Sequence, residues 1–147
     1  MRKLGRKKSF RESMIRNLTT SLLLYEKVDT TSAKAKELRV SAEKIISKAK
    51  KGNLNDIRYI YSYLYDKNAS RKLLEEIVPR YKKRNSGFVS LFRIGRRNGD
   101  DASITRVELI ENKVFIDNKD ENKKQTLNNK NDKKSPNKKK NDEKSNE

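Results

Sequence analysis

The first amphipathic pattern along the chain lies between residues 9 and 25. Apolar side chains recur there every three or four positions, which predicts a helix with one apolar face. Ser9 and Glu12 have the spacing of a capping box, in which each side chain satisfies a backbone donor at the start of a helix. We therefore expect the helix to begin at Ser9, after a basic arm over residues 1–8. Its expected apolar positions are Phe10, Met14, Leu18, Leu22 and Tyr25.

A weak strand and the most regular helix come next. Residues 27–31 form a short β-prone segment. Thr31 or Ser32 can cap a helix that ends at Gly52, because glycine is favoured just after a helix. The expected apolar positions of this helix are Ala35, Leu38, Ala42, Ile45, Ile46 and Ala49.

Two shorter helices are predicted before Pro79. The first opens at Asn53 and the second is capped by Asn68. Pro79 disfavours an uninterrupted continuation, because proline lacks an N–H and restrains the residue before it. Residues 80–84 can add one further turn. The expected apolar positions are Ile57, Ile60, Tyr61 and Leu64 in the first helix, and Leu73, Leu74, Ile77 and Val78 in the second.

A β-hairpin is predicted after the helices. Residues 88–94 and 104–110 are rich in β-branched and aromatic side chains, and Asn98 with Gly99 between them is a typical hairpin signal. The element order within residues 1–116 is therefore α-β-α-α-α-β-β.

The composition changes abruptly at Asp117. From there to Glu147 the only aliphatic or aromatic residue is Leu127, which is too little apolar surface to offset the entropy of ordering the segment. We expect residues 117–147 to be a disordered Asn/Lys-rich tail. Its ten Lys against seven Asp or Glu leave it at +3, so +15 of the total charge of +18 belongs to residues 1–116.

Composition also excludes several classes of function. The chain has no cysteine and no histidine, which removes disulfides, thiolate metal sites and the commonest general base and metal ligand. The longest apolar run, from Leu22 to Tyr25, is far shorter than the roughly 20 residues that cross a bilayer. The apolar residues near the start are separated by polar ones, unlike those of an export signal.

Two basic concentrations point to a polyanionic partner. A run of charge is often only the solvated face of a domain, but such a face ordinarily mixes signs. Like charges on a small domain repel one another unless a polyanion neutralises them, so we favour nucleic acid. The first concentration is Arg2, Lys3, Arg6, Lys7, Lys8, Arg11 and Arg16. The second is Arg80, Lys82, Lys83, Arg84, Arg93, Arg96 and Arg97.

Two further features are open to two interpretations. Asn98 and Gly99 can bring the backbone close to a phosphate, or they can form a plain turn. Alternate tyrosines on a helix point in different directions, so at most two of them share a face. For this cluster we favour core and boundary packing over a stacking platform for bases. The cluster is Tyr59, Tyr61, Tyr63 and Tyr65.

No catalytic or metal-binding pattern is visible. Glu75 and Glu76 are helix neighbours that diverge, and Asp100 with Asp101 would need further ligands to hold a metal. The phosphate-cradling glycine motifs are absent. We therefore expect neither an enzyme nor a cofactor.

Several separated segments resemble one family. They are SFRESMIRNLTTSL from Ser9, TTSAKAKELR from Thr30, VPRY from Val78, and the stretch from Gly87 through RRNGDDA to Leu109. In this order they are similar to the bacterial large-subunit ribosomal protein seventeen family, over about residues 1–111. The resemblance implies an α/β (α+β) fold of two layers, with helices packed on a small mixed sheet. It also implies a cytoplasmic ribosomal protein that binds large-subunit ribosomal RNA near the outer end of the peptide exit tunnel, beside other ribosomal proteins.

The RNA-facing residues follow from the resemblance and from the basic concentrations together. The positions that match the family's motifs are Arg6, Ser9, Arg11, Arg16, Asn17, Thr30, Thr31, Lys34, Lys36, Arg80, Arg97, Gly99 and Asp100. Arg2, Lys3, Lys7, Lys8, Lys82, Lys83, Arg84, Arg93, Arg96 and Asn98 complete the expected set. The chain departs from the family at Phe10, Tyr25 and Ser90, where the family commonly has His, His and Arg.

Two rival functions share part of this pattern. A nucleoid-type DNA-binding protein would carry the same charge. A peripheral membrane protein would use the helix after Ser9. However, the apolar face of that helix is needed for the core, and its polar face contains Glu12, Ser13, Asn17 and Thr20, which gives it weak interfacial character. No membrane or small-molecule partner is expected.

Overall fold

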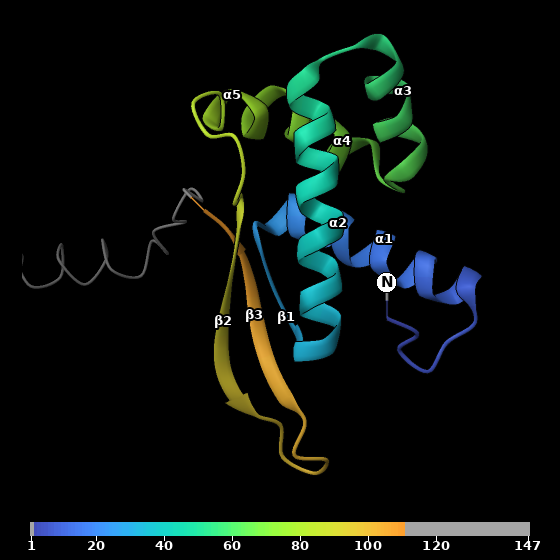
Figure 1. Ribbon diagram of the computed structural model, residues 1–147, viewed down its shortest axis with the longest axis vertical. Coiled ribbons are helices and arrows are strands. Elements are labelled where there is room, and N and C mark those ends of the chain that lie inside the picture. Colours follow the sequence, from blue (N-terminus) through green and yellow to red (C-terminus); the bar gives the residue numbers. More distant parts are fainter. Residues whose placement is uncertain (1, 111–147) are drawn as a thin grey trace, which may run out of the picture. The chain divides into compact units, whose positions relative to one another are not determined.

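The computed structural model describes residues 2–110, and the expected tail at 117–147 lies outside them. Its helices and strands follow the predicted order, with a π-helical segment inside the fourth predicted helix (Figure 1). The elements are α1 (Lys8–Tyr25), β1 (Lys27–Thr31), α2 (Ser32–Lys51), α3 (Leu54–Tyr63), α4 (Lys67–Lys72), the π-helix η1 (Leu73–Ile77), α5 (Val78–Arg80), β2 (Val89–Arg96) and β3 (Ser103–Leu109).

The sheet has the strand order β1-β3-β2, so the last strand lies in the middle. Both pairings are antiparallel, with Val28 opposite Val107 on one side and Leu91 opposite Val107 on the other. The expected mixed sheet is therefore wrong in this detail. The hairpin makes β2 and β3 antiparallel, and β1 also runs opposite to the central strand.

Helices cover one face of this sheet, which confirms the two-layer α+β prediction. The long helix α2 packs on all three strands, with α3, α4 and α5 grouped near its C-terminal end and the hairpin tip beyond its N-terminal end (Figure 1). The core between the layers contains Leu38, Ile45, Val107 and Leu109, each at most 2% exposed. Burying such side chains is the main favourable term for a small domain.

The start of α1 differs from the prediction. Lys7 is at the N-cap without a side-chain hydrogen bond, and Ser9 already lies inside the helix, so the capping box is wrong. The apolar stripe is also displaced, because Phe10 is 68% and Tyr25 67% exposed. The buried face runs instead through positions spaced by four, three and one residues, which form one side of a helix. These positions are Ile15, Thr19, Leu22 and Leu23.

Helix α2 matches the prediction throughout. All six of its expected apolar positions are buried, and it ends at Gly52, whose φ of 68° is in the left-handed region that glycine adopts at little cost. Thr31 occupies the N-cap, although its side chain makes no capping hydrogen bond. The helix is 20 residues and therefore about 30 Å long.

The helix before Tyr81 is more continuous than expected. Asp66 rather than Asn68 is the N-cap, and its Oδ1 accepts a hydrogen bond from the Asn68 N–H at 2.7 Å. The chain then remains helical through Pro79 by widening into the π-helical turn η1. A π-helical turn shifts the hydrogen-bond pattern by one residue, which allows the helix to continue through a proline. The predicted extra turn follows, where the Arg84 N–H donates to the Tyr81 carbonyl at 3.0 Å.

The predicted hairpin is confirmed, with a longer tip than a two-residue turn. The Arg97 N–H donates to the Ala102 carbonyl at 2.9 Å and closes the loop. Gly99 has a φ of 106°, which strongly favours glycine at that position. The register of β2 and β3 shifts by one residue between Arg93 and Gly95, which marks a β-bulge.

Candidate nucleic-acid interface

Two predicted groups of residues that are distant in the sequence meet at the N-terminal end of α2. Lys36 from the second turn of α2 and Arg93 and Arg96 from β2 line a cavity of about 570 Å³ between the helix and the inner face of the hairpin. Neither Lys36 nor Arg93 forms an ion pair with any described residue. No carboxylate in that range therefore balances their positive charges, which can attract an anionic partner. We call this the α2–hairpin cleft.

Hydroxyl groups hold the two walls of the α2–hairpin cleft together. Ser32 Oγ lies 2.6 Å from Ser103 Oγ and 2.6 Å from Thr105 Oγ1, so the first residue of α2 is fastened to β3. The first turn of α2 contains no acidic residue. The unpaired N–H groups and the dipole at this end add to the attraction for anions that the basic side chains exert.

The N-terminal arm folds back towards the same end of α2. The Arg2 N–H donates a hydrogen bond to Glu37 Oε1 at 3.0 Å, and the Arg6 N–H donates to the Lys3 carbonyl at 3.1 Å. The arm therefore forms a turn, and its first residues lie beside the second turn of α2. Its exposed basic side chains are Arg2, Lys3, Arg6, Lys7 and Lys8.

The hairpin tip is less positive than its sequence suggests. Arg97 donates to both oxygens of Asp100, at 3.0 and 2.6 Å, and Arg96 pairs with Asp101. The hydrogen bonds from Arg97 and from the Ala102 N–H lower the pKa of Asp100 to about 2. Two arginines and two aspartates thus nearly cancel at the tip, while Asn98 and Gly99 form the exposed turn between them.

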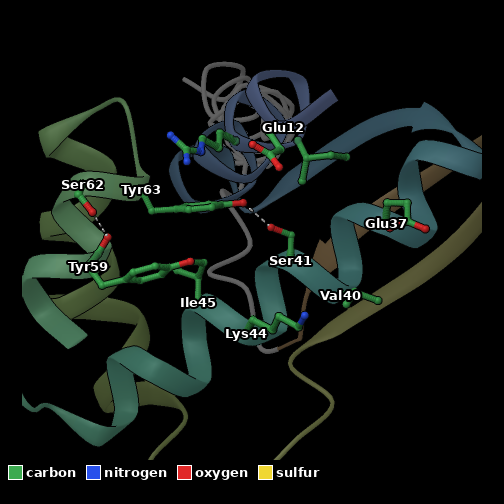
Figure 2. A pocket seen from close by; sticks show the side chains of 11 residues that line it. Glu12, Glu37, Val40, Ser41, Lys44, Ile45, Tyr59, Ser62 and Tyr63 are labelled. Carbon is green, nitrogen blue, oxygen red and sulfur yellow. Dashed lines mark hydrogen bonds between the residues drawn. The ribbon is translucent and has the colours of Figure 1, made fainter. Parts of the chain in front are cut away.

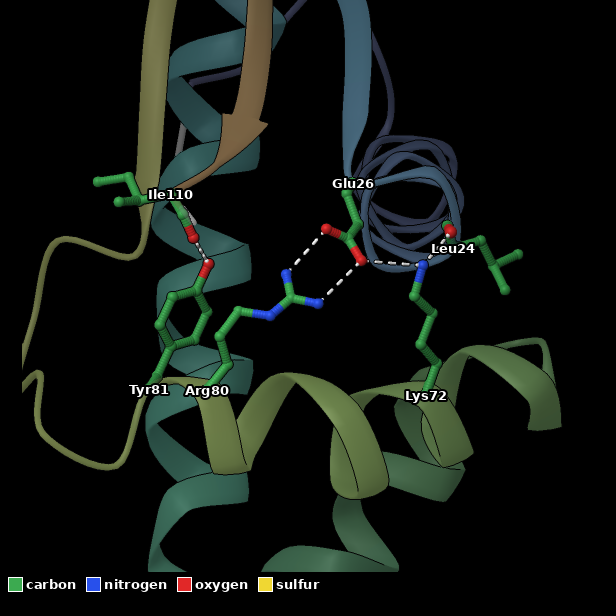
Figure 3. Close-up of polar contacts among 6 residues, drawn as sticks. All are labelled: Leu24, Glu26, Lys72, Arg80, Tyr81 and Ile110. Carbon is green, nitrogen blue, oxygen red and sulfur yellow. Dashed lines mark hydrogen bonds and ion pairs between the residues drawn. The ribbon is translucent and has the colours of Figure 1, made fainter. Parts of the chain in front are cut away.

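Arg80 lies in a different environment from the other predicted residues. Its Nη1 and Nη2 donate to the two carboxylate oxygens of Glu26 at 2.8 and 3.2 Å, and Lys72 Nζ lies 3.1 Å from the same carboxylate (Figure 3). The Glu26 side chain is 3% exposed and that of Arg80 13%. Arg80 therefore serves an internal ion pair, and we leave it out of the proposed interface.

The pKa of Glu26 reflects this pairing. Burial alone raises it, but the hydrogen bonds from Arg80 and Lys72 outweigh burial and lower the pKa below its ordinary value of 4.5. Sequence reasoning did not single out Glu26. The available signal was its position just after the C-terminus of a helix, where the dipole disfavours a carboxylate and a cationic partner is needed.

A second basic surface lies at the opposite end of α2. Lys82 and Lys83 are exposed after α5, and Lys50 Nζ donates to the Arg84 carbonyl, which joins this turn to the last turn of α2. Lys50 and Lys51 belong to this surface but were not predicted. The predicted set is thus divided between two ends of a helix that is about 30 Å long.

The remaining predicted residues lie on α1, β1 and α2 and just before β2. Asn17 and Ser9 are exposed on α1, while Arg11 is partly buried and its Nη1 donates to the Arg6 carbonyl at 3.3 Å. Arg16 is partly buried above Tyr63. Thr30 and Thr31 on β1, Lys34 on α2 and Arg84 before β2 are partly buried.

Other kinds of site are not found within residues 2–110. No group of three or more carboxylates there could hold a metal ion. In the same range no helix is both long and apolar enough to cross a membrane.

Comparison with known proteins identifies the family. The family model described as Ribosomal protein L17 matches residues 14–110. The chain belongs to this family. The large ribosomal subunit protein bL17 of Pelobacter propionicus is 46% identical over 110 residues, covering 75% of this chain and 87% of the relative. The protein of the same name from Caldanaerobacter subterraneus subsp. tengcongensis is 45% identical over 109 residues, covering 74% and 97%. That of Clostridium botulinum is 42% identical over 109 residues, covering 74% and 96%.

Membership of the Ribosomal protein L17 family confirms the resemblance found in the sequence. It identifies the chain as a bacterial ribosomal protein with a structural role, which also confirms that it is not an enzyme. The matched region, residues 14–110, includes the α2–hairpin cleft and the basic surface at the other end of α2. The basic arm lies outside the region that the family model matches.

Proposed function

We propose that the chain is a structural constituent of the large ribosomal subunit that binds large-subunit ribosomal RNA. The observation that carries this proposal is the α2–hairpin cleft, where Lys36 and Arg93 lie together without carboxylate partners among the described residues. The large-subunit role stated in the names of the relatives supports it. We further propose that the site on the subunit is near the outer end of the peptide exit tunnel, beside other ribosomal proteins.

The mechanism of binding is neutralisation of phosphates on a rigid surface. The α2–hairpin cleft and the arm supply cations at one end of α2, and Lys82, Lys83 and Lys51 supply them at the other. The deep, narrow major groove of A-form RNA excludes side chains, so recognition depends on backbone, 2′-hydroxyls and tertiary shape. A helix of about 30 Å between two cationic ends spans more than one strand of folded RNA.

The test combines salt dependence with competition. The full chain is titrated with large-subunit ribosomal RNA from the same genome at increasing salt. The slope of log affinity against log salt should be steep, with roughly 0.7–0.9 for each phosphate contact. A flat response would contradict phosphate binding. Duplex DNA that competes as well as the RNA would favour a nucleoid-type protein.

Location requires an experiment on the assembled particle. The tagged chain should co-sediment with large subunits in a sucrose gradient at moderate salt. Chemical cross-linking of those subunits should join it to proteins around the tunnel exit. Absence from the subunit fraction would refute the ribosomal placement, and cross-links confined to another region would refute the exit site alone.

A further inference from the structure

Four side chains from three helices form a ladder of rings and cations. The guanidinium carbon of Arg16 on α1 lies 5.0 Å from the ring centre of Tyr63 on α3. Tyr63 stacks on Tyr59 with ring centres 5.8 Å apart and planes inclined by 21°. Lys48 Nζ on α2 lies 3.4 Å from the ring centre of Tyr59. Cations over aromatic faces stabilise such an arrangement and hold the rings at the surface.

The four tyrosines of the cluster divide between the core and its boundary, as expected from the sequence. Tyr59 and Tyr63 share a face, as predicted for residues four apart, but only Tyr63 packs against the core. Tyr59, Tyr61 and Tyr65 are 40%, 49% and 56% exposed, so these three lie at the boundary and not in the core. Tyr59 is the one of the three that also lines a cavity.

A groove runs beside the ladder between α1, α2 and α3 (Figure 2). It contains a cavity of about 390 Å³, and a second hollow lies next to it, because both are lined by Val40, Lys44 and Tyr59. The Tyr63 hydroxyl is held 2.8 Å from Ser41 Oγ. The groove thus contains one ring held by a hydrogen bond, Tyr63, and one more exposed ring, Tyr59. We call it the tyrosine groove.

One polar group in the tyrosine groove lacks a partner. Arg16 Nε is buried and has no hydrogen-bond acceptor, and the Arg16 guanidinium forms no ion pair with any residue in the range 2–110. Arg39 and Arg106, by contrast, each pair with a carboxylate. In the ladder Arg16 contacts Tyr63 and Lys48 contacts Tyr59, so Arg16 holds the inner ring, and a ligand stacked on Tyr59 would replace Lys48.

The lining of the tyrosine groove matches a nucleobase better than a phosphate alone. Its walls combine tyrosine rings and Val40 with groups of both signs, Glu12 and Lys44 among them. A base has a flat apolar face and an edge with donors and acceptors, and RNA-binding proteins commonly stack extruded bases on aromatic rings or arginine planes. Glu37 lines the same groove and binds the Arg2 N–H, so the groove adjoins the basic arm.

We propose that the tyrosine groove binds one extruded base of the RNA, stacked on Tyr59. The base takes the place of Lys48 on the Tyr59 ring, and Lys44 and Lys48 contact the adjoining phosphates. Lys48 covers the Tyr59 ring in the free protein, and this flexible side chain swings aside when the base enters. The inference rests on the proposed function, and it adds a base contact to an interface otherwise made of phosphate contacts.

Two variants of one helix provide a matched test. Tyr59→Leu removes the more exposed of the two rings that line the groove. Tyr61→Leu removes a ring that is 49% exposed, against 40% for Tyr59, and that does not line the groove. Tyr59→Leu should bind large-subunit ribosomal RNA about tenfold more weakly, as expected for one lost base stack, while Tyr61→Leu should bind within about twofold of wild type. The salt slope should stay unchanged in both, because no charge is lost. Equal affinities for the two variants would overturn the proposal.

Photochemical cross-linking provides a second, independent readout. The wild-type chain is irradiated with the same RNA and digested with trypsin, which releases residues 59–67 as one peptide. Mass spectrometry should find a nucleotide attached at Tyr59. Attachment only at Tyr61 or Tyr65 would overturn the proposal.

The outcomes separate this inference from the proposed function. Wild-type protein that fails to bind the RNA at all refutes the proposed function. Wild-type protein that binds with a steep salt slope, but whose Tyr59→Leu variant is unaffected, refutes only the base site. Assembled large subunits in which Tyr59 cross-links to a protein instead of RNA would also refute it. Circular dichroism verifies that each variant is folded.

Discussion

Two clusters in this domain each contain one arginine and one lysine, but one cluster is buried around a carboxylate and the other faces a cleft. Arg80 and Lys72 surround the buried Glu26 carboxylate and are closed off from solvent. Arg93 and Lys36 face a cleft without a carboxylate among the described residues. Pairing, rather than the density of charge along the sequence, distinguishes a cation that stabilises the fold from one that is available to RNA.

The largest expected effect is the loss of the internal carboxylate. Glu26→Gln leaves Arg80 and Lys72 buried without a counter-charge, so the free energy of unfolding should fall by about 3–5 kcal/mol. Urea denaturation followed by circular dichroism measures this change. Asp29→Asn, which breaks the exposed pair with Arg106, is the control and should cost at most about 1 kcal/mol. Equal losses in the two variants would show that the Glu26 cluster has no special role.

Low pH should reduce the difference in stability between wild type and Glu26→Gln. The pKa of Glu26 is lower in the folded than in the unfolded protein, so its contribution to stability is complete above the ordinary value of 4.5 and is lost as the pH falls through the folded-state pKa. The stability gap between wild type and Glu26→Gln should therefore narrow below about pH 4.5. Denaturation curves of both proteins between pH 7 and 3 provide the measurement. A constant gap would mean that the carboxylate charge is not what stabilises the cluster.

Substitutions in the α2–hairpin cleft should affect RNA binding and leave stability nearly unchanged. Lys36→Ala with Arg93→Ala should lower the salt slope of RNA binding by roughly 1.4–1.8, one phosphate contact for each residue. Stability should change by less than about 0.5 kcal/mol per substitution, because neither side chain has an internal partner. Arg71→Ala, on the exposed face of α4, is the control for a lost surface cation. A slope that falls as much in the control would refute a specific role for the cleft.

The smallest expected effect concerns the hairpin tip, where the arginines are paired with carboxylates but exposed to solvent. Asp100→Asn removes the carboxylate that engages Arg97, so one more guanidinium becomes available to phosphate. The salt slope should rise by at most roughly 0.7–0.9, with affinity for any RNA increased a few-fold at low salt. Filter binding with ribosomal RNA and with an unrelated transcript measures both changes. Weaker binding would mean that the Arg97–Asp100 pair itself positions the tip for RNA.

The parts of the fold that could be predicted are those with local signals. The six apolar positions of α2 and its terminal Gly52 marked that helix correctly, and Asn98 with Gly99 marked the hairpin. The S-x-x-E spacing at Ser9 was misleading, because serine and glutamate also occur in the first turn of a helix without capping it. Periodicity showed a helix there but not the exact side that it buries.

The parts of the site that could not be predicted depend on contacts between distant residues. Glu26 and Arg80 are 54 positions apart, so no sequence window contains the pair that removes Arg80 from the surface. The meeting of Lys36 with Arg93 likewise arises only when the hairpin packs beside α2. The pairing of charges at the hairpin tip could have been predicted from the sequence, because a hairpin at Asn98 and Gly99 places Arg97 beside Asp100.

The place of β3 in the middle of the sheet has a consequence for synthesis. Its partners β1 and β2 precede it in the chain, so neither can complete its pairing until residues 103–109 have been made. Until then each presents an unpaired strand edge, the feature through which nascent chains associate wrongly. The domain can therefore finish folding only when β3 has been made and pairs with both neighbours. By then the ribosome has synthesised nearly all of residues 1–110.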